Sequence, residues 1–125
     1  HVTADFSHWV CVSESMLENF QPELKETIKR SRHVHARIGH EQGPQVSDPF
    51  APEWDYALQK FLSWWDDIVK VNLAMGASYL TFTTEFGPVP YMPVLPYTGM
   101  PVANQFMLNC KIKDLLRQRY AKLSN

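Results

Sequence analysis

The stretch Arg32-His33-Val34-His35-Ala36-Arg37-Ile38-Gly39 decides the fold. Side chains alternate between the two faces of an extended strand, so the two histidines and Arg37 share one face. The valine, alanine and isoleucine between them share the other face. Burying imidazoles and a guanidinium without partners is costly, so we expect these groups to meet carboxylates, a metal ion or water. A half-buried edge strand with a solvated polar face is the alternative.

The composition fits one small globular domain. The chain has 125 residues, of which 45% are hydrophobic, and its 12 Lys and Arg nearly balance its 13 Asp and Glu. This balance leaves no broad basic field for nucleic acid or for an anionic membrane. No apolar run reaches membrane-spanning length, and the first residues lack the features of a signal peptide. We therefore expect a cytoplasmic protein that binds neither nucleic acid nor a membrane.

Strand and helix patterns alternate along the chain. Alternation of this kind implies right-handed crossovers and an α/β fold with a parallel sheet and outer helices. The expected strands cover residues 2–5, 32–38 and 78–84. The expected helices cover residues 13–20, 22–30, 52–76 and 102–122.

Residues that can bind a metal ion accompany each expected strand. Asp5 ends the first strand, His35 lies on the second, and Glu85 follows the third. The carboxyl ends of parallel strands meet at one edge of a sheet, so we expect these side chains to converge. Two carboxylates and one imidazole suit Mn²⁺, with Mg²⁺, Co²⁺ or Zn²⁺ as alternatives. Each residue also has a structural alternative: a helix cap, a hydrogen-bonded core histidine and a solvated strand end, respectively.

Three motifs follow one another at the strand ends: Asp5-x-x-His8, His33-x-His35 and Thr84-Glu85-Phe86-Gly87-Pro88. Together they resemble the xylose-isomerase-like TIM barrels, in particular the sugar phosphate isomerase/epimerase family, which includes ketose 3-epimerases. The resemblance covers residues 1–125 as one partial domain and implies the C-terminal three βα units of a (β/α)8 TIM barrel. Three strands cannot close a barrel. A homo-oligomer or the missing N-terminal barrel half would then have to cover the open sheet edges and an apolar face.

The resemblance implies a metal-dependent isomerase or epimerase that acts on a sugar or a sugar phosphate. In that family Glu, Asp, His and Glu from four strands hold the metal. Asp5, His35 and Glu85 would be three of these ligands, and the first Glu lies outside this chain. Glu85 would also be one of the two glutamates that move a proton next to the sugar carbonyl. His33 would orient the ligands or hydrogen-bond to them.

The same resemblance suggests residues that contact the substrate. His8 matches a histidine near the carbonyl end of the sugar. Arg37 could neutralise an enediolate or bind a hydroxyl or a phosphate. The epimerases place an arginine a few residues further on, where this chain has Glu41-Gln42. His40 and Trp54 could line the pocket or lie exposed on the surface.

Two other functional hypotheses stay open. The isolated chain could fold or assemble without a complete site, because one acid/base glutamate is absent. The superfamily also contains apurinic-site endonucleases of the endonuclease IV kind, whose three-zinc pattern includes an Asp-x-His. This chain has Asp48-Pro49-Phe50 instead, so one zinc site would lack a ligand. That departure and the near-neutral charge argue against a metal-dependent DNA phosphodiesterase.

Overall fold

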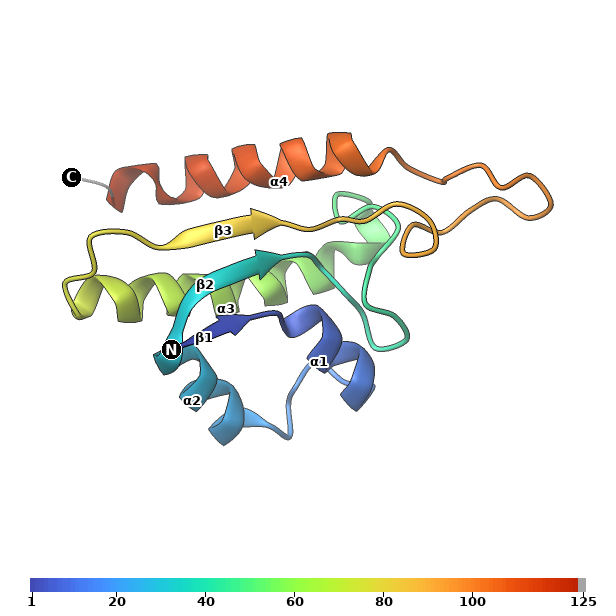
Figure 1. Ribbon diagram of the computed structural model, residues 1–125. Helices are drawn as coiled ribbons and strands as arrows, with labels where there is room; N and C mark the ends of the chain where they lie inside the picture. Colours follow the sequence, from blue (N-terminus) through green and yellow to red (C-terminus); the bar gives the residue numbers. More distant parts are fainter. Residues whose placement is uncertain (124–125) are drawn as a thin grey trace.

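The computed structural model describes residues 1–123, which form an α/β fold around one parallel sheet with the strand order β1-β2-β3. The strands are β1 (Val2–Ala4), β2 (Ser31–Ala36) and β3 (Thr81–Thr84). The helices are α1 (Phe6–Ser13), α2 (Gln21–Arg30), α3 (Asp55–Ala74) and α4 (Gln105–Tyr120), with short 3-10 turns η1 (Pro52–Trp54) and η2 (Ala121–Leu123). Figure 1 shows three arrows with one direction, α3 behind the sheet and α4 beside β3. The predicted α/β class and parallel sheet are confirmed.

One face of β2 packs against α3 and forms the core. Val34 and Ile38 are completely buried, in one cluster with Phe61, Trp65 and Ile68 of α3. Fully burying a valine or isoleucine side chain contributes about 1.5–3 kcal/mol. The alternation in the sequence therefore turns the two β2 histidines to the opposite face.

The opposite face of the sheet is polar. His33 is level with Thr3 of β1 and with Thr81 of β3, and His35 is level with Thr83. These three threonines are exposed. The expectation that the sheet leaves an apolar face uncovered is therefore wrong, because α3 and its neighbours already cover the apolar side.

The first helix lies earlier than the sequence predicts. A helix was expected over residues 13–20, but α1 ends where that range begins. Its N-cap is Asp5, whose side chain accepts a hydrogen bond from the backbone N–H of Ser7, and it ends at Glu14 in the left-handed region, at φ 48°. Burial of Val10 against the core outweighs the weak helix propensity of the β-branched and aromatic residues in this segment.

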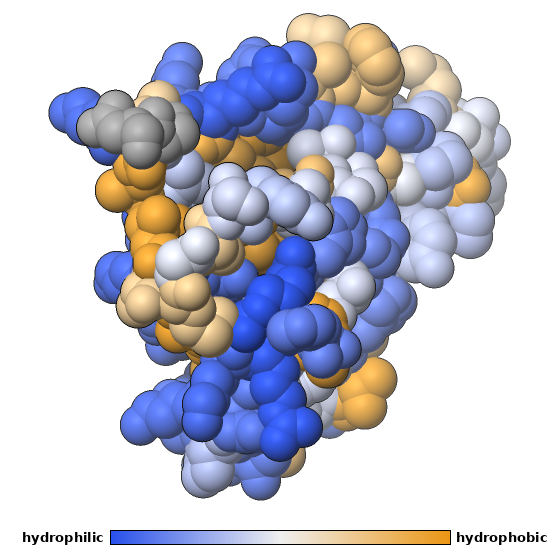
Figure 2. All heavy atoms as spheres, turned by 60° about the vertical axis from the view of Figure 1, so that its left-hand side comes forward, coloured by the Kyte–Doolittle hydropathy of each residue, from blue (hydrophilic) through white to orange (hydrophobic). Residues whose placement is uncertain are grey.

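The other elements lie close to their predicted ranges, although β3 is shorter than expected and α3 begins after η1. Figure 2 turns the starting ends of the strands forward, and on this face orange apolar side chains stand among blue polar ones. Within residues 1–123, none of the helices combines the length and the apolar character needed to cross a membrane.

Candidate metal centre

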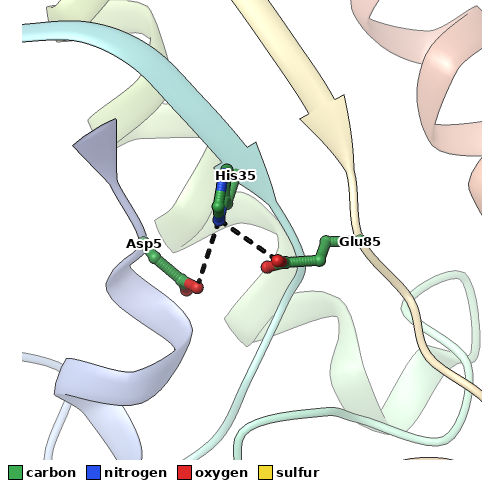
Figure 3. A group of neighbouring side chains, drawn as sticks. All are labelled: Asp5, His35 and Glu85. Carbon is green, nitrogen blue, oxygen red and sulfur yellow. Dashed lines mark ion pairs between the residues drawn. The ribbon is translucent and has the colours of Figure 1, made fainter.

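Three strands bring Asp5, His35 and Glu85 together. Asp5 directly follows β1, His35 lies in β2 and Glu85 directly follows β3, and their ligand atoms lie within 4.8 Å of one another. The Nδ1 atom of His35 is 3.2 Å from Oε1 of Glu85 and 3.7 Å from Oδ2 of Asp5. Figure 3 shows both carboxylates directed toward the same edge of the imidazole. The expected convergence of these three side chains is observed.

Asp5 uses its two carboxylate oxygens differently. Oδ1 accepts hydrogen bonds from the backbone N–H of Ser7, at 3.2 Å, and from the Ser7 hydroxyl, at 2.6 Å. Oδ2 faces the site, 3.6 Å from Nε2 of His8 and 3.7 Å from Nδ1 of His35. Asp5 therefore caps α1 and also contributes a carboxylate oxygen to the cluster, so its two expected roles are not alternatives.

Arg37 lies beneath the cluster and is only 3% exposed. Its Nη2 atom is 3.7 Å from Oδ2 of Asp5 and 3.9 Å from Oε2 of Glu85. The same atom is 2.8 Å from Nε2 of His8. A guanidinium only donates, so this hydrogen bond needs the Nε2 lone pair and places the proton of a neutral His8 on Nδ1.

Two partners of Arg37 carried no obvious signal in the sequence. The hydroxyl of Ser7 accepts a hydrogen bond from Nε of Arg37, at 3.1 Å, and the ring of Tyr91 covers the guanidinium at 4.8 Å. Gly87 permits this arrangement, because a Cβ there would stand 3.1 Å from the Tyr91 ring. Ser7 is the second residue of the helix that Asp5 caps, and this position is the one hint of it in the sequence. Tyr91 lies in a proline-rich loop without periodicity, so no pattern points to it.

The cluster meets the chemical requirements for a divalent cation. Two atoms that each bind an ion at about 2.1 Å lie about 3–4 Å apart, which the two distances from His35 match. Among residues 1–123, Oε2 of Glu85 is one of two buried side-chain oxygens or nitrogens without a hydrogen-bond partner. Carboxylate oxygens and an imidazole nitrogen are common ligands of divalent ions, and the expected order of Mn²⁺ before Mg²⁺, Co²⁺ or Zn²⁺ stays a prediction.

His33 contacts a candidate ligand without hydrogen-bonding to it. Its ring nitrogens lie 2.6 Å from the hydroxyl of Thr81 and 3.0 Å from that of Thr83. Its ring meets the His35 ring edge to face, with the centroids 5.3 Å apart. His33 therefore supports His35 by ring packing and is itself fixed to β3.

His40 and Trp54 form a separate pair in the β2–α3 loop region. Their ring centroids are 4.6 Å apart, and the indole N–H of Trp54 donates to the hydroxyl of Ser47. Burial lowers the pKa of His40, and the charge of Glu41 partly offsets this shift. Within residues 1–123, the ring contacts and hydrogen bonds of the pair are thus with the loop, η1 and Tyr56 at the start of α3, and not with Asp5 or Glu85.

Comparisons of the chain with protein-family models, with curated proteins and with solved structures found no significant match. The resemblance to xylose-isomerase-like barrels therefore stays a prediction from three sequence motifs. What stands independently of it is the geometry: one imidazole, two carboxylates and a buried guanidinium at the carboxyl edge of a parallel sheet.

Proposed function

We propose that this chain is the C-terminal part of a metal-dependent isomerase or epimerase that moves a proton next to the carbonyl of a sugar or sugar phosphate. In this proposal, residues 1–125 are the last three βα units of a TIM barrel. One observation carries it: Asp5, His35 and Glu85 come from three adjacent parallel strands and meet within 4.8 Å. Sites of α/β enzymes lie at this edge of the sheet. The predicted cytoplasmic location stays part of the proposal.

Each residue of the cluster has a distinct role. Asp5, His35 and Glu85 hold the divalent ion, which when bound polarises the substrate oxygens and stabilises negative charge on them. The Glu85 carboxylate also exchanges the proton next to the carbonyl. The half-exposed side chain of His8 is available to a sugar hydroxyl. Arg37 is buried, so we assign it to balancing the two carboxylates and not to contacting the substrate.

The test is Mn²⁺ binding by isothermal titration calorimetry to the chain and to two variants. Asn caps a helix as well as Asp does, so Asp5→Asn keeps α1 intact and removes only the ligand charge. We expect one Mn²⁺ per chain and at least about tenfold weaker binding in Asp5→Asn. Asp67→Asn removes an exposed carboxylate of α3 as a matched control and leaves binding unchanged. Equal affinity in all three proteins contradicts the proposal.

Activity assays separate the proposed function from its alternatives. Turnover of a ketose with Mn²⁺ supports the isomerase or epimerase. Mn²⁺ binding without turnover indicates an incomplete site, because the family's first ligand glutamate is absent from this chain. Cleavage of DNA that contains abasic sites favours the phosphodiesterase.

We also propose that a second copy or N-terminal barrel units cover the sheet edges. In the described residues, β1 and β3 each pair with β2 alone. Several large apolar side chains of the β3–α4 loop and the start of α4 are also exposed, among them Tyr97, Met100 and Phe106. Unpaired strand edges and exposed apolar side chains both favour association.

A further inference from the structure

We infer that Gln45 and Asn109 are positioning residues for Glu85, because their side-chain amides each clamp one of the two residues that follow it, by hydrogen bonds to the backbone N–H and C=O of that residue. The inference rests on the proposed role of Glu85 as a ligand and proton carrier. It concerns residues that no motif in the sequence singles out.

Asn109 holds the backbone of Phe86, the first of these two residues. Its Oδ1 accepts a hydrogen bond from the backbone N–H of Phe86, at 2.8 Å, and its Nδ2 donates to the carbonyl of Phe86, at 2.9 Å. Asn109 lies in α4, so the clamp is anchored on a helix of 16 residues. The side chain of Phe86 is itself buried in the core.

Gln45 holds the backbone of Gly87, the second residue, in the same way. Its Oε1 accepts from the backbone N–H of Gly87, at 2.8 Å, and its Nε2 donates to the carbonyl of Gly87, at 3.1 Å. Gln45 is 4% exposed, and its neighbour Val46 donates a backbone hydrogen bond to Ile38 just beyond β2. The clamp therefore ties the loop after β3 to the loop after β2.

The two clamps act where backbone pairing stops. β3 ends at Thr84, so Glu85 lies beyond the hydrogen-bonded ladder with β2. Its carboxylate lies 3.2 Å from the His35 imidazole and 3.9 Å from the Arg37 guanidinium, and its Oε2 has no hydrogen-bond partner. The direction of the Glu85 side chain therefore depends on the conformation of the backbone that carries it. The side-chain amides of Gln45 and Asn109 give the backbone of Phe86 and Gly87 the hydrogen-bond donors and acceptors that a neighbouring strand would otherwise provide.

A side-chain amide can serve both the backbone N–H and the C=O of one residue, which a carboxylate of the same size cannot. The C=O of Asn or Gln accepts while its NH₂ donates, whereas a carboxylate only accepts. Gln45→Glu and Asn109→Asp keep the size of the side chain but set an anionic oxygen against a backbone carbonyl. Each variant therefore disturbs the backbone at Phe86 or Gly87, just after Glu85, without opening a cavity.

The experiment detects a displacement of the Glu85 carboxylate by its effect on the neighbouring His35 in the metal-free protein. The probe is the ¹⁵N chemical shift of His35 Nδ1, which lies 3.2 Å from Oε1 of Glu85. We expect Gln45→Glu and Asn109→Asp each to move this shift in the protein that carries Glu85, and to leave it unmoved in the Glu85→Gln background. Gln59→Glu on the exposed surface of α3 is the control and leaves the shift unchanged.

Mn²⁺ affinity gives the second readout. We expect Gln45→Glu and Asn109→Asp to weaken Mn²⁺ binding about 10- to 100-fold, and to have no further effect once Glu85 is Gln. A general loss of structure weakens binding in both backgrounds, which overturns the inference. An unmoved His35 shift in both clamp variants also overturns it. If the unmodified chain binds no Mn²⁺, the proposed function fails, whereas the shift experiment still decides the positioning role.

Discussion

Replacing Arg37 with Met tests whether the buried guanidinium balances the two carboxylates above it. Methionine keeps much of the side-chain volume and removes the charge. Deleting one partner of a buried ion pair costs about 3–5 kcal/mol. The side chains of Asp5 and Glu85 are 19% and 34% exposed, so water takes up part of the unbalanced charge. We therefore expect Arg37→Met to lower the free energy of unfolding by about 2–3 kcal/mol in EDTA.

Mn²⁺ should reduce the loss of stability that Arg37→Met causes. The cation takes over the charge that Arg37 provided, so Mn²⁺ stabilises Arg37→Met more than it stabilises the unmodified chain. Each tenfold gain in affinity adds about 1.4 kcal/mol to the stability measured at saturating ion. Urea unfolding followed by tryptophan fluorescence, with and without Mn²⁺, measures both effects in one series.

Arg30→Met is the matched control. Nε of Arg30 pairs with Glu26 at 2.6 Å, but both side chains are at least half exposed. Exposed pairs of this kind contribute about 0.5 kcal/mol or less. Equal losses in the two variants refute the charge-balance argument. A large loss in Arg37→Met that Mn²⁺ does not reduce shows instead that Arg37 acts by packing under Tyr91.

Two further predictions concern the outer surface of the fold. Asp66 accepts hydrogen bonds from Arg119 and Tyr120, and the bonds from Arg119 hold the pKa of Asp66 below its ordinary value. A depressed folded-state pKa stabilises the protein above the ordinary carboxyl range and loses this effect as the pH falls through that pKa. Asp66→Asn should thus cost about 1 kcal/mol at pH 7, and the gap should close below about pH 4; a gap independent of pH contradicts this. Sedimentation velocity of residues 1–125 should show species larger than a monomer, and a well-folded monomer contradicts the proposed association.

The position of the candidate site could be predicted from the sequence because two physical rules decide it. Alternation along β2 puts Val34 in the core and His35 on the open face, whatever the rest of the chain does. The order of strands and helices then fixes which strand ends are neighbours. These two steps are enough to predict that Asp5 and Glu85 lie beside His35.

The wrong bounds of the first helix and the residues that the sequence did not reveal depend on contacts between segments far apart in the chain. The helix predicted over residues 13–20 was misplaced, because Asp5 caps α1 and packing of Val10 against the core holds it. Gln45 and Asn109 were missed because a side chain that pairs with a distant peptide unit leaves no periodic signal. Their partners lie 42 and 23 residues away along the chain.

The need for a helix cap does not by itself explain why Asp5 carries a charge. An N-cap can be Ser, Thr or Asn as well as Asp, and the attraction of a negative charge to a helix N-terminus is worth only about 0.3–1 kcal/mol. The cap uses Oδ1, so a neutral residue would satisfy it, yet Oδ2 brings a charge toward His35 and Arg37. Glu85 directly follows β3, and its buried Oε2 lies 3.9 Å from Nη2 of Arg37 without a hydrogen-bond partner. The cation proposed above would account for two carboxylates that face one imidazole at the same place in the fold.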